Sequence, residues 1–144
     1  MRRNGNALSL SILLLLSCWP SAPVGAADWH EVGISDDKTV YWVEVQSLSK
    51  QGDIVVAWIK KAYADPQSAS NGATYNSDKV LRHFDCKKRQ SGIKAMSFYS
   101  GADWSGSVVY TGNVSDEDVE LSDIVPDTIG EAVLAFVCSK APTK

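Results

Sequence analysis

The chain has 144 residues, a hydrophobic fraction of 44% and a formal net charge of −3 at pH 7. This length is typical of one domain, and the mildly acidic balance lacks the basic excess of nucleic-acid-binding proteins. Composition therefore excludes a general nucleic-acid binder and predicts a small globular domain.

The N-terminus has the pattern of a secretory signal peptide. Arg2 and Arg3 form a positive start, residues 7–16 form an apolar run, and small residues precede a cleavage motif that ends at Ala26. The apolar run is too short to span a bilayer as a stop-transfer helix. We therefore expect cleavage after Ala26.

The mature chain is then residues 27–144, a single domain with no transmembrane segment, and residues 1–26 are the signal peptide. Loss of the two leader arginines changes the formal charge from −3 to −5. An alternative is a lipid anchor at Cys18, because Leu15-Leu16-Ser17-Cys18 resembles a lipobox.

Six stretches are rich in β-branched and aromatic residues, which is typical of strands. They are residues 29–35, 39–45, 54–63, 80–86, 93–99 and 107–111. Turn-forming residues separate them, including a polar connection at 46–53 and a break at Asp65-Pro66-Gln67. The stretch 54–63 has large apolar residues on both faces, so we expect it in the middle of the sheet.

Residues 126–138 are predicted to form one amphipathic helix. Pro126 suits a helix start, Asp127 or Thr128 can cap it, and Thr128 with Glu131 forms a capping box. Its apolar face carries Ile129, Val133, Phe136 and Val137. Six strands in a meander with one helix on one side predict an α+β fold with an antiparallel sheet.

Cys86 and Cys138 are the cysteines that remain if Cys18 leaves with the signal peptide. In an oxidising compartment they most simply form one disulfide, and two buried free thiols are the alternative. A closed loop of about fifty residues gives roughly 4 kcal/mol of stabilisation. Cys86 then faces the helix, and alternation places Phe84, Arg82 and Val80 on the same face.

No motif in the sequence indicates catalysis, a cofactor or a metal. His30 and His83 lie on separate predicted strands, and GxSxG, CxxC and phosphate-loop patterns are absent. The acidic stretch 113–123 lacks the glycine and spacing of a calcium-binding loop. We therefore predict a protein that is not an enzyme.

Five basic residues are the candidate ligand-binding set: Arg82, Lys87, Lys88, Arg89 and Lys94. They lie on or beside one predicted hairpin of an otherwise acidic protein. Such a cluster can hold a polyanion, such as a sulfated glycan, a lipid A phosphate or an acidic protein loop. The alternative is a solvated turn whose charges block edge pairing.

The stretch 54–63 carries Ile54, Val56 and Trp58 on one face and Val55, Ala57 and Ile59 on the other, and one short helix can cover only one of these faces. An exposed patch of that size is unusual for a monomer. A homodimer is therefore possible, and a sheet that curls over itself is the alternative.

Landmarks along nearly the whole mature chain have a recurring order and spacing. Phe84-Asp85-Cys86 and Pro126-x-x-x-Gly130-Glu131 with Cys138 are two of them. The others are Trp29, Tyr41-Trp42-Val43-Glu44, Ser47-Leu48, Gly52-Asp53, Val56-x-Trp58, Tyr63-x-x-Pro66-Gln67 and Tyr75-x-Ser77. Together they resemble the surface-adhesin protein E family of Gram-negative bacteria.

The resemblance implies a curved antiparallel sheet with a C-terminal helix tied to its concave side by a disulfide. The family's best-known member is an outer-membrane lipoprotein adhesin that binds host matrix proteins such as vitronectin and laminin. The resemblance thus implies a non-enzymatic envelope protein, in the periplasm or at the cell surface, with a protein or polyanionic ligand. The alternative is a periplasmic accessory or structural protein whose partner lies in its own envelope.

Overall fold

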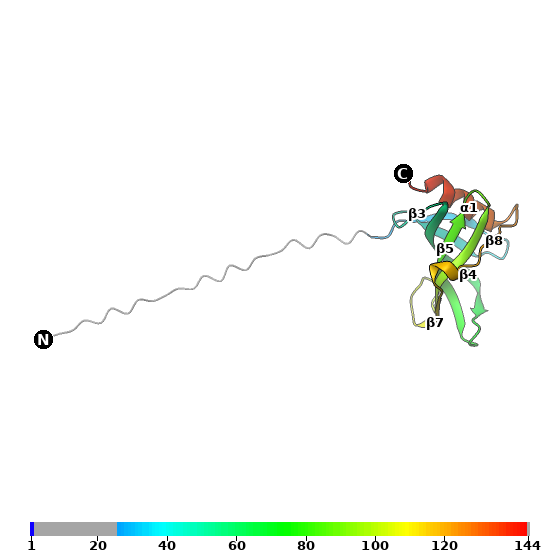
Figure 1. Cartoon of the computed structure of the whole chain (residues 1–144). Coiled ribbons are helices and arrows are strands. Elements are labelled where there is room, and N and C mark those ends of the chain that lie inside the picture. Colours follow the sequence, from blue (N-terminus) through cyan, green and yellow to red (C-terminus); the bar gives the residue numbers. More distant parts are fainter. Residues whose placement is uncertain (2–25, 144) are drawn as a thin grey trace.

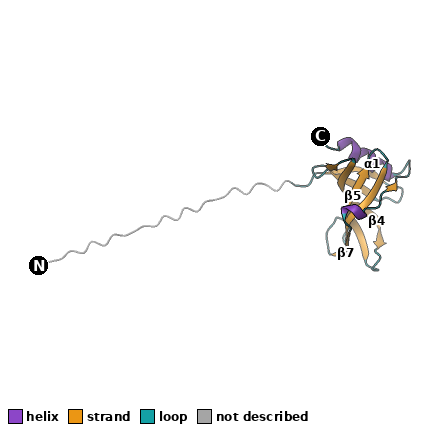
Figure 2. Ribbon diagram, in the orientation of Figure 1, coloured by secondary structure: helices purple, strands orange, loops and turns teal. Residues whose placement is uncertain are grey.

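One antiparallel sheet holds most of the regular structure, and helix α1 (Ile129–Lys140) packs against one of its faces (Figures 1 and 2). The computed structural model describes Met1 and residues 26–143. The strands are β1 (Trp29–Ile34), β2 (Val40–Glu44), β3 (Ser49–Gln51), β4 (Ile54–Ser68), β5 (Thr74–Asp85), β6 (Gln90–Tyr99), β7 (Val108–Asn113) and β8 (Ser122–Asp123). A short 3-10 helix, η1 (Asp116–Asp118), precedes β8.

The strand order is β1-β2-β4-β5-β6-β7, with β3 paired to β4 and β8 paired to β6. Strand β4 pairs with three neighbours, so its predicted central position is confirmed. The predicted α+β fold, an antiparallel sheet with one C-terminal helix, is confirmed as well. The prediction of about six strands covers the main path, and β3 and β8 are two short additions to it.

The predicted signal peptide lies outside the described residues except at its ends, Met1 and Ala26. The alternative lipid anchor at Cys18 also lies outside them, so both stay predictions. Within residues 26–143, no helix has the length and apolar character that crossing a membrane would require.

Pro66 does not end the third long strand, contrary to the sequence prediction. Strand β4 continues to Ser68 and β5 already begins at Thr74, so the two form a long hairpin. A register shift between Ala62 and Gln67 lets the chain pass Pro66, because a bulge tolerates a residue without an N–H group. Figure 1 shows this hairpin continuing beyond the part of the sheet that α1 covers.

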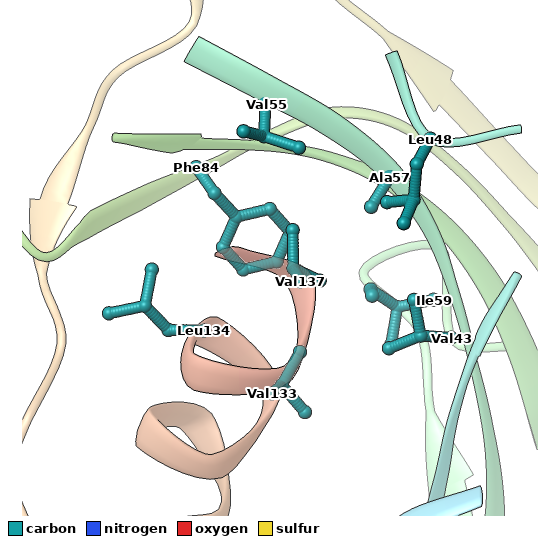
Figure 3. Close-up of a cluster of buried hydrophobic side chains, with 9 residues drawn as sticks. All are labelled: Val43, Leu48, Val55, Ala57, Ile59, Phe84, Val133, Leu134 and Val137. Atoms are coloured by element: carbon teal, nitrogen blue, oxygen red, sulfur yellow. The ribbon is translucent and has the colours of Figure 1, made fainter. Parts of the chain in front are cut away.

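The hydrophobic core lies between α1 and the strands beneath it. Figure 3 shows strand side chains pointing toward the helix. The fully or nearly buried members are Val43, Leu48, Val55, Ala57, Ile59, Phe84, Val133, Leu134 and Val137. Phe84 is 1% exposed, which confirms that its face of β5 meets the helix.

Local capping and one covalent bond fix the helix on the sheet. Thr128 is the N-cap, and its Oγ1 accepts a hydrogen bond from the Glu131 N–H at 3.4 Å. The Glu131 carboxylate accepts from the Asp127 N–H at 2.8 Å, so the predicted capping box reaches back one residue further than expected. At the other end, the predicted Cys86–Cys138 disulfide is confirmed.

Glu44, which is 5% exposed, is a buried carboxylate that ties the chain before β1 to the turn after β2. It accepts hydrogen bonds from the N–H groups of Asp28, Gln46 and Ser47. Burial alone would raise the pKa of Glu44, but these hydrogen bonds outweigh it and hold the pKa below its ordinary value.

We therefore expect Glu44→Gln to lower the free energy of unfolding at pH 7 by about 2 kcal/mol. A carboxylate with a lowered folded-state pKa stabilises the fold fully above its unfolded-state pKa, which is about 4.3. The stabilisation is lost as the pH falls through the folded-state pKa. Urea unfolding should thus show a smaller difference in free energy of unfolding between the parent and Glu44→Gln at pH 3 than at pH 7. The substitution of the exposed Glu31 by Gln is the control. An equal loss of stability at both pH values would contradict the stabilising role of the ionised Glu44 carboxylate.

Candidate functional site

A cavity of about 280 Å³ opens beside the first turn of α1, above the helix-facing side of the sheet. We call it the Arg82 pocket. Its lining residues come from β2, β4, β5, β6, the β8 segment and the start of α1: Tyr41, Ile59, Lys61, Val80, Arg82, Phe84, Ser91, Ile93, Ser122, Asp123, Ile124, Val125, Thr128, Gly130 and Val133. Six aliphatic side chains and Phe84 form the apolar part of this wall, and the charged groups among them decide what the pocket can bind.

Arg82 is the largest polar group on this wall. Its Nη2 donates a hydrogen bond to the Ser91 Oγ at 2.9 Å, and its guanidinium lies 5.9 Å from the centre of the Phe84 ring. Among the described residues, no Asp or Glu oxygen lies within 4.0 Å of it. Its Nε is buried and has no hydrogen-bond partner there.

The surroundings of the Arg82 guanidinium disfavour its positive charge. Burial lowers the pKa of Arg82, and the charges of Tyr41 and Asp78 only partly oppose that effect. An arginine carries five N–H donors in a planar fork that matches a carboxylate. Arg82 therefore has donors available for an anion, in a setting where each such hydrogen bond is strengthened by low dielectric.

Lys61, the other cation on the wall, is already paired. Its Nζ lies 2.9 Å from the Oδ2 of Asp78, whose side chain is 2% exposed. The Tyr63 hydroxyl donates to the same oxygen at 2.6 Å. Burial first, and then the charge of Asp78, raises the pKa of Tyr63, so this phenol stays a donor. Lys61 thus neutralises Asp78 and leaves Arg82 as the pocket's cation with free donors.

The lining contains no histidine or cysteine. Its hydroxyl groups belong to Tyr41, Ser91, Ser122 and Thr128, and Asp123 supplies its one carboxylate. Among the residues the structure describes, no three His, Cys, Asp or Glu side chains cluster as a metal site would require. The arrangement is suited to holding one anionic group flanked by apolar atoms.

The structure does not bring the five basic residues of the candidate set together. Arg82 lies in the pocket, whereas the other four lie outside it. Lys87 and Lys88 lie in the exposed β5–β6 turn, beside Asp53 at 2.7 Å and Asp85 at 3.9 Å. Arg89 pairs with Glu131 at the start of α1, and Lys94 pairs with Asp116. Polyanion binding at the turn stays a prediction, and each of its cations already has an acidic neighbour.

The alternation rule predicted that Arg82 faces the helix, but no local pattern distinguished it from the basic residues of the hairpin. The available signal was an arginine between Val80 and Phe84 on a face that should be apolar. Tyr41, Lys61 and Thr128 were not predicted as site residues. They reach the pocket only through the pairing of β2, β4 and β5 and through the docking of α1.

The fold and sequence have counterparts among known proteins. Residues 29–139 match the family model described as surface-adhesin protein E. A structure of Haemophilus influenzae protein E is similar with a TM-score of 0.54 and 12% identity, covering 84% of this chain and 90% of that chain. Its selenomethionine form has a TM-score of 0.53 at 12% identity, with 84% and 92% covered. A second crystal form has a TM-score of 0.52 at 12% identity, with 69% and 80% covered. No curated protein matches the sequence.

Proposed function

Because the chain belongs to the surface-adhesin protein E family, we propose that it is a non-enzymatic binding module of the cell envelope whose Arg82 pocket takes an acidic group of a protein ligand. The observation that carries this proposal is Arg82 itself. It is a half-buried arginine whose Nε is buried, without a carboxylate partner among the described residues, in a cavity partly walled by aliphatic side chains. An acidic side chain or a C-terminal carboxylate with an apolar neighbour matches both features.

Family membership implies an exported, surface-exposed protein of a Gram-negative bacterium. We further propose that the chain is cleaved after Ala26 rather than lipidated at Cys18. We also propose that its ligands are host matrix proteins rather than a partner in the same envelope. Labelling of intact cells with a membrane-impermeant amine reagent distinguishes a host-binding surface protein from a periplasmic one. Modification of the exposed Lys87 and Lys88 supports the adhesin, and protection from the reagent supports the periplasmic alternative.

We expect Arg82→Met to weaken binding to immobilised vitronectin or laminin at least about tenfold. A charged hydrogen bond contributes about 1.5–3 kcal/mol, and 1.4 kcal/mol is a factor of ten in Kd. The variant should fold, because exchanging a half-buried unpaired cation for an apolar side chain of similar length is often neutral or stabilising. Surface plasmon resonance measures the binding, and thermal unfolding checks the fold.

Arg89→Met is the matched control, since Arg82 and Arg89 are the two arginines of residues 27–144. Arg89 lies in the exposed turn and is 52% exposed, so the same chemical change there should leave binding nearly unaltered. Equal binding by the Arg82 variant and the parent chain would contradict the pocket. Failure of the parent chain to bind either protein would contradict the host-matrix assignment.

The possible homodimer concerns the other face of the sheet and stays a separate proposal. Part of that face is covered from within the chain, because the loop of residues 100–107 folds back over it. The Trp104 Nε1 donates to the Asp78 carbonyl at 2.9 Å, and its backbone N–H donates to the Ser77 Oγ at 3.0 Å. A dimer would have to form around this loop.

A further inference from the structure

All four tryptophans of residues 27–144 gather on the sheet face away from α1. Trp29 comes from β1, Trp42 from β2, Trp58 from β4, and Trp104 from the loop that follows β6. The rings of Trp42 and Trp104 meet edge to face with centroids 5.2 Å apart. These residues are half-buried rather than covered, so they form an aromatic surface across several strands.

Lys60 lies at the centre of this surface. Its Nζ lies 4.7 Å from the ring centre of Trp29, 5.2 Å from that of Trp42 and 3.8 Å from that of Trp104. The rings stabilise the ammonium group through cation–π attraction. They do not neutralise it, so the charge remains available to an anion.

A second lysine faces the first. Lys79 is the direct cross-strand partner of Lys60, and its Nζ lies 5.4 Å from the centre of the Tyr99 ring. Two like charges directly opposite each other destabilise a sheet. Burial and the charge of Lys79 together lower the pKa of Lys60. Among the described residues, neither ammonium group has a carboxylate oxygen within 4.0 Å.

A groove of about 330 Å³ lies on this face beside Lys79. Its lining residues are Ala27, Trp29, Glu44, Ser47, Trp58, Lys79, Ser97 and Tyr99. Glu44 is the carboxylate of this lining, and its oxygens accept hydrogen bonds from the backbone N–H groups of Asp28, Gln46 and Ser47. The groove therefore combines aromatic rings with the ammonium group of Lys79, which has no ion-pair partner among the described residues.

We propose that this face, made of Trp29, Trp42, Trp58, Lys60, Lys79, Tyr99 and Trp104, binds an acidic glycan. A pyranose ring presents a flat array of C–H groups that packs against an indole, and a uronate or sulfate group accepts hydrogen bonds from lysines. An anion between Lys60 and Lys79 would also relieve their repulsion. A second copy of the chain fits less well, since a two-fold dimer would bring four of these lysines into one interface.

The test uses a heparin hexasaccharide and the mature, oxidised protein. Since all four tryptophans lie on this face, saturating hexasaccharide should change the intrinsic tryptophan fluorescence. Lys60→Gln with Lys79→Gln should raise the Kd at least tenfold by calorimetry. The pair removes a repulsion, so thermal unfolding should show a fold at least as stable as the parent's.

Lys87→Gln with Lys88→Gln is the matched control, because it makes the same change of charge in the β5–β6 turn. It should leave the Kd within twofold. Trp29→Leu keeps every charge and changes an aromatic residue of an edge strand. It should weaken binding several-fold, whereas binding through charge alone would be unaffected by this substitution.

Three results would overturn the proposal. One is loss of binding in the Lys87/Lys88 variant but not in the Lys60/Lys79 variant, which would place the polyanion at the turn. Another is the absence of binding by the parent chain at low salt. The third is a dimer in sedimentation at micromolar concentration that the Lys60/Lys79 variant strengthens, since this face would then belong to a second copy.

Discussion

Replacing Cys86 and Cys138 together with serine is expected to lower the free energy of unfolding by about 4 kcal/mol. The two residues are 52 positions apart, and the bond removes the freedom of that loop from the unfolded chain. The bond also joins the end of β5 to the last turn of α1, whose Val133, Leu134 and Val137 close the core. A loss of this size is a large part of a small domain's stability.

Urea unfolding of the double variant measures this effect. The parent chain in a strong reductant is the control and should lose a similar amount. Hydrogen exchange should show the α1 amides losing protection before those of β4 and β5, because the helix rests on side-chain packing once the tether is gone. If the double variant unfolds within about 1 kcal/mol of the parent, packing alone holds the helix and the tether is of minor importance.

Lys61→Met should produce the second largest loss, about 3 kcal/mol. The substitution removes the ammonium group 2.9 Å from Asp78 and leaves that carboxylate buried with the Tyr63 hydroxyl as its remaining side-chain donor. The other oxygen of Asp78 is already buried without a hydrogen-bond partner in the described structure. A carboxylate in this position has lost the hydration that would otherwise stabilise it.

Two further variants make this prediction specific. Lys50→Met changes an exposed lysine of β3 in the same way and should alter the free energy of unfolding by no more than about 0.5 kcal/mol. Adding Asp78→Asn to Lys61→Met should recover part of the loss, because the buried group is then neutral. A Lys61 variant as stable as the Lys50 variant would mean that the ion pair contributes nothing.

Local sequence rules predicted the parts of the fold that depend on neighbouring residues. Thr128 and Glu131 cap the helix because the two lie three positions apart on the chain. Phe84 faces the core because strand side chains alternate. The disulfide followed from the count of cysteines in an exported chain.

The same rules failed where pairing with a distant strand decides the structure. Pro66 marks a break by its local chemistry, yet the β4–β5 ladder absorbs it in a bulge. Strand β3 is short and fully exposed, so its residues show no alternation of apolar and polar side chains that could have revealed it.

The candidate sites could not be predicted from the sequence, because pairing between distant strands brings their residues together. Trp29, Trp42, Trp58 and Trp104 have no regular spacing, and only the strand order and the fold of the loop after β6 bring them around Lys60. Lys60 and Lys79 are 19 positions apart in the chain and become neighbours through the register of β4 and β5. Clustering along the sequence instead drew attention to the turn at Lys87 and Lys88, where each lysine has an acidic neighbour.

If Arg82 is free to take a carboxylate, nuclear magnetic resonance of its Nε–H group should detect the binding. Residues 27–144 contain two arginines, so a chain of these residues gives two side-chain signals, and that of Arg89 serves as an internal control for that of Arg82. Titration with hexanoate, a carboxylate with an apolar tail, should shift the Arg82 signal to saturation and leave Arg89 in place, whereas hexanamide should shift neither. An Arg82 signal that hexanoate does not move, or two arginine signals that move alike, would contradict the account.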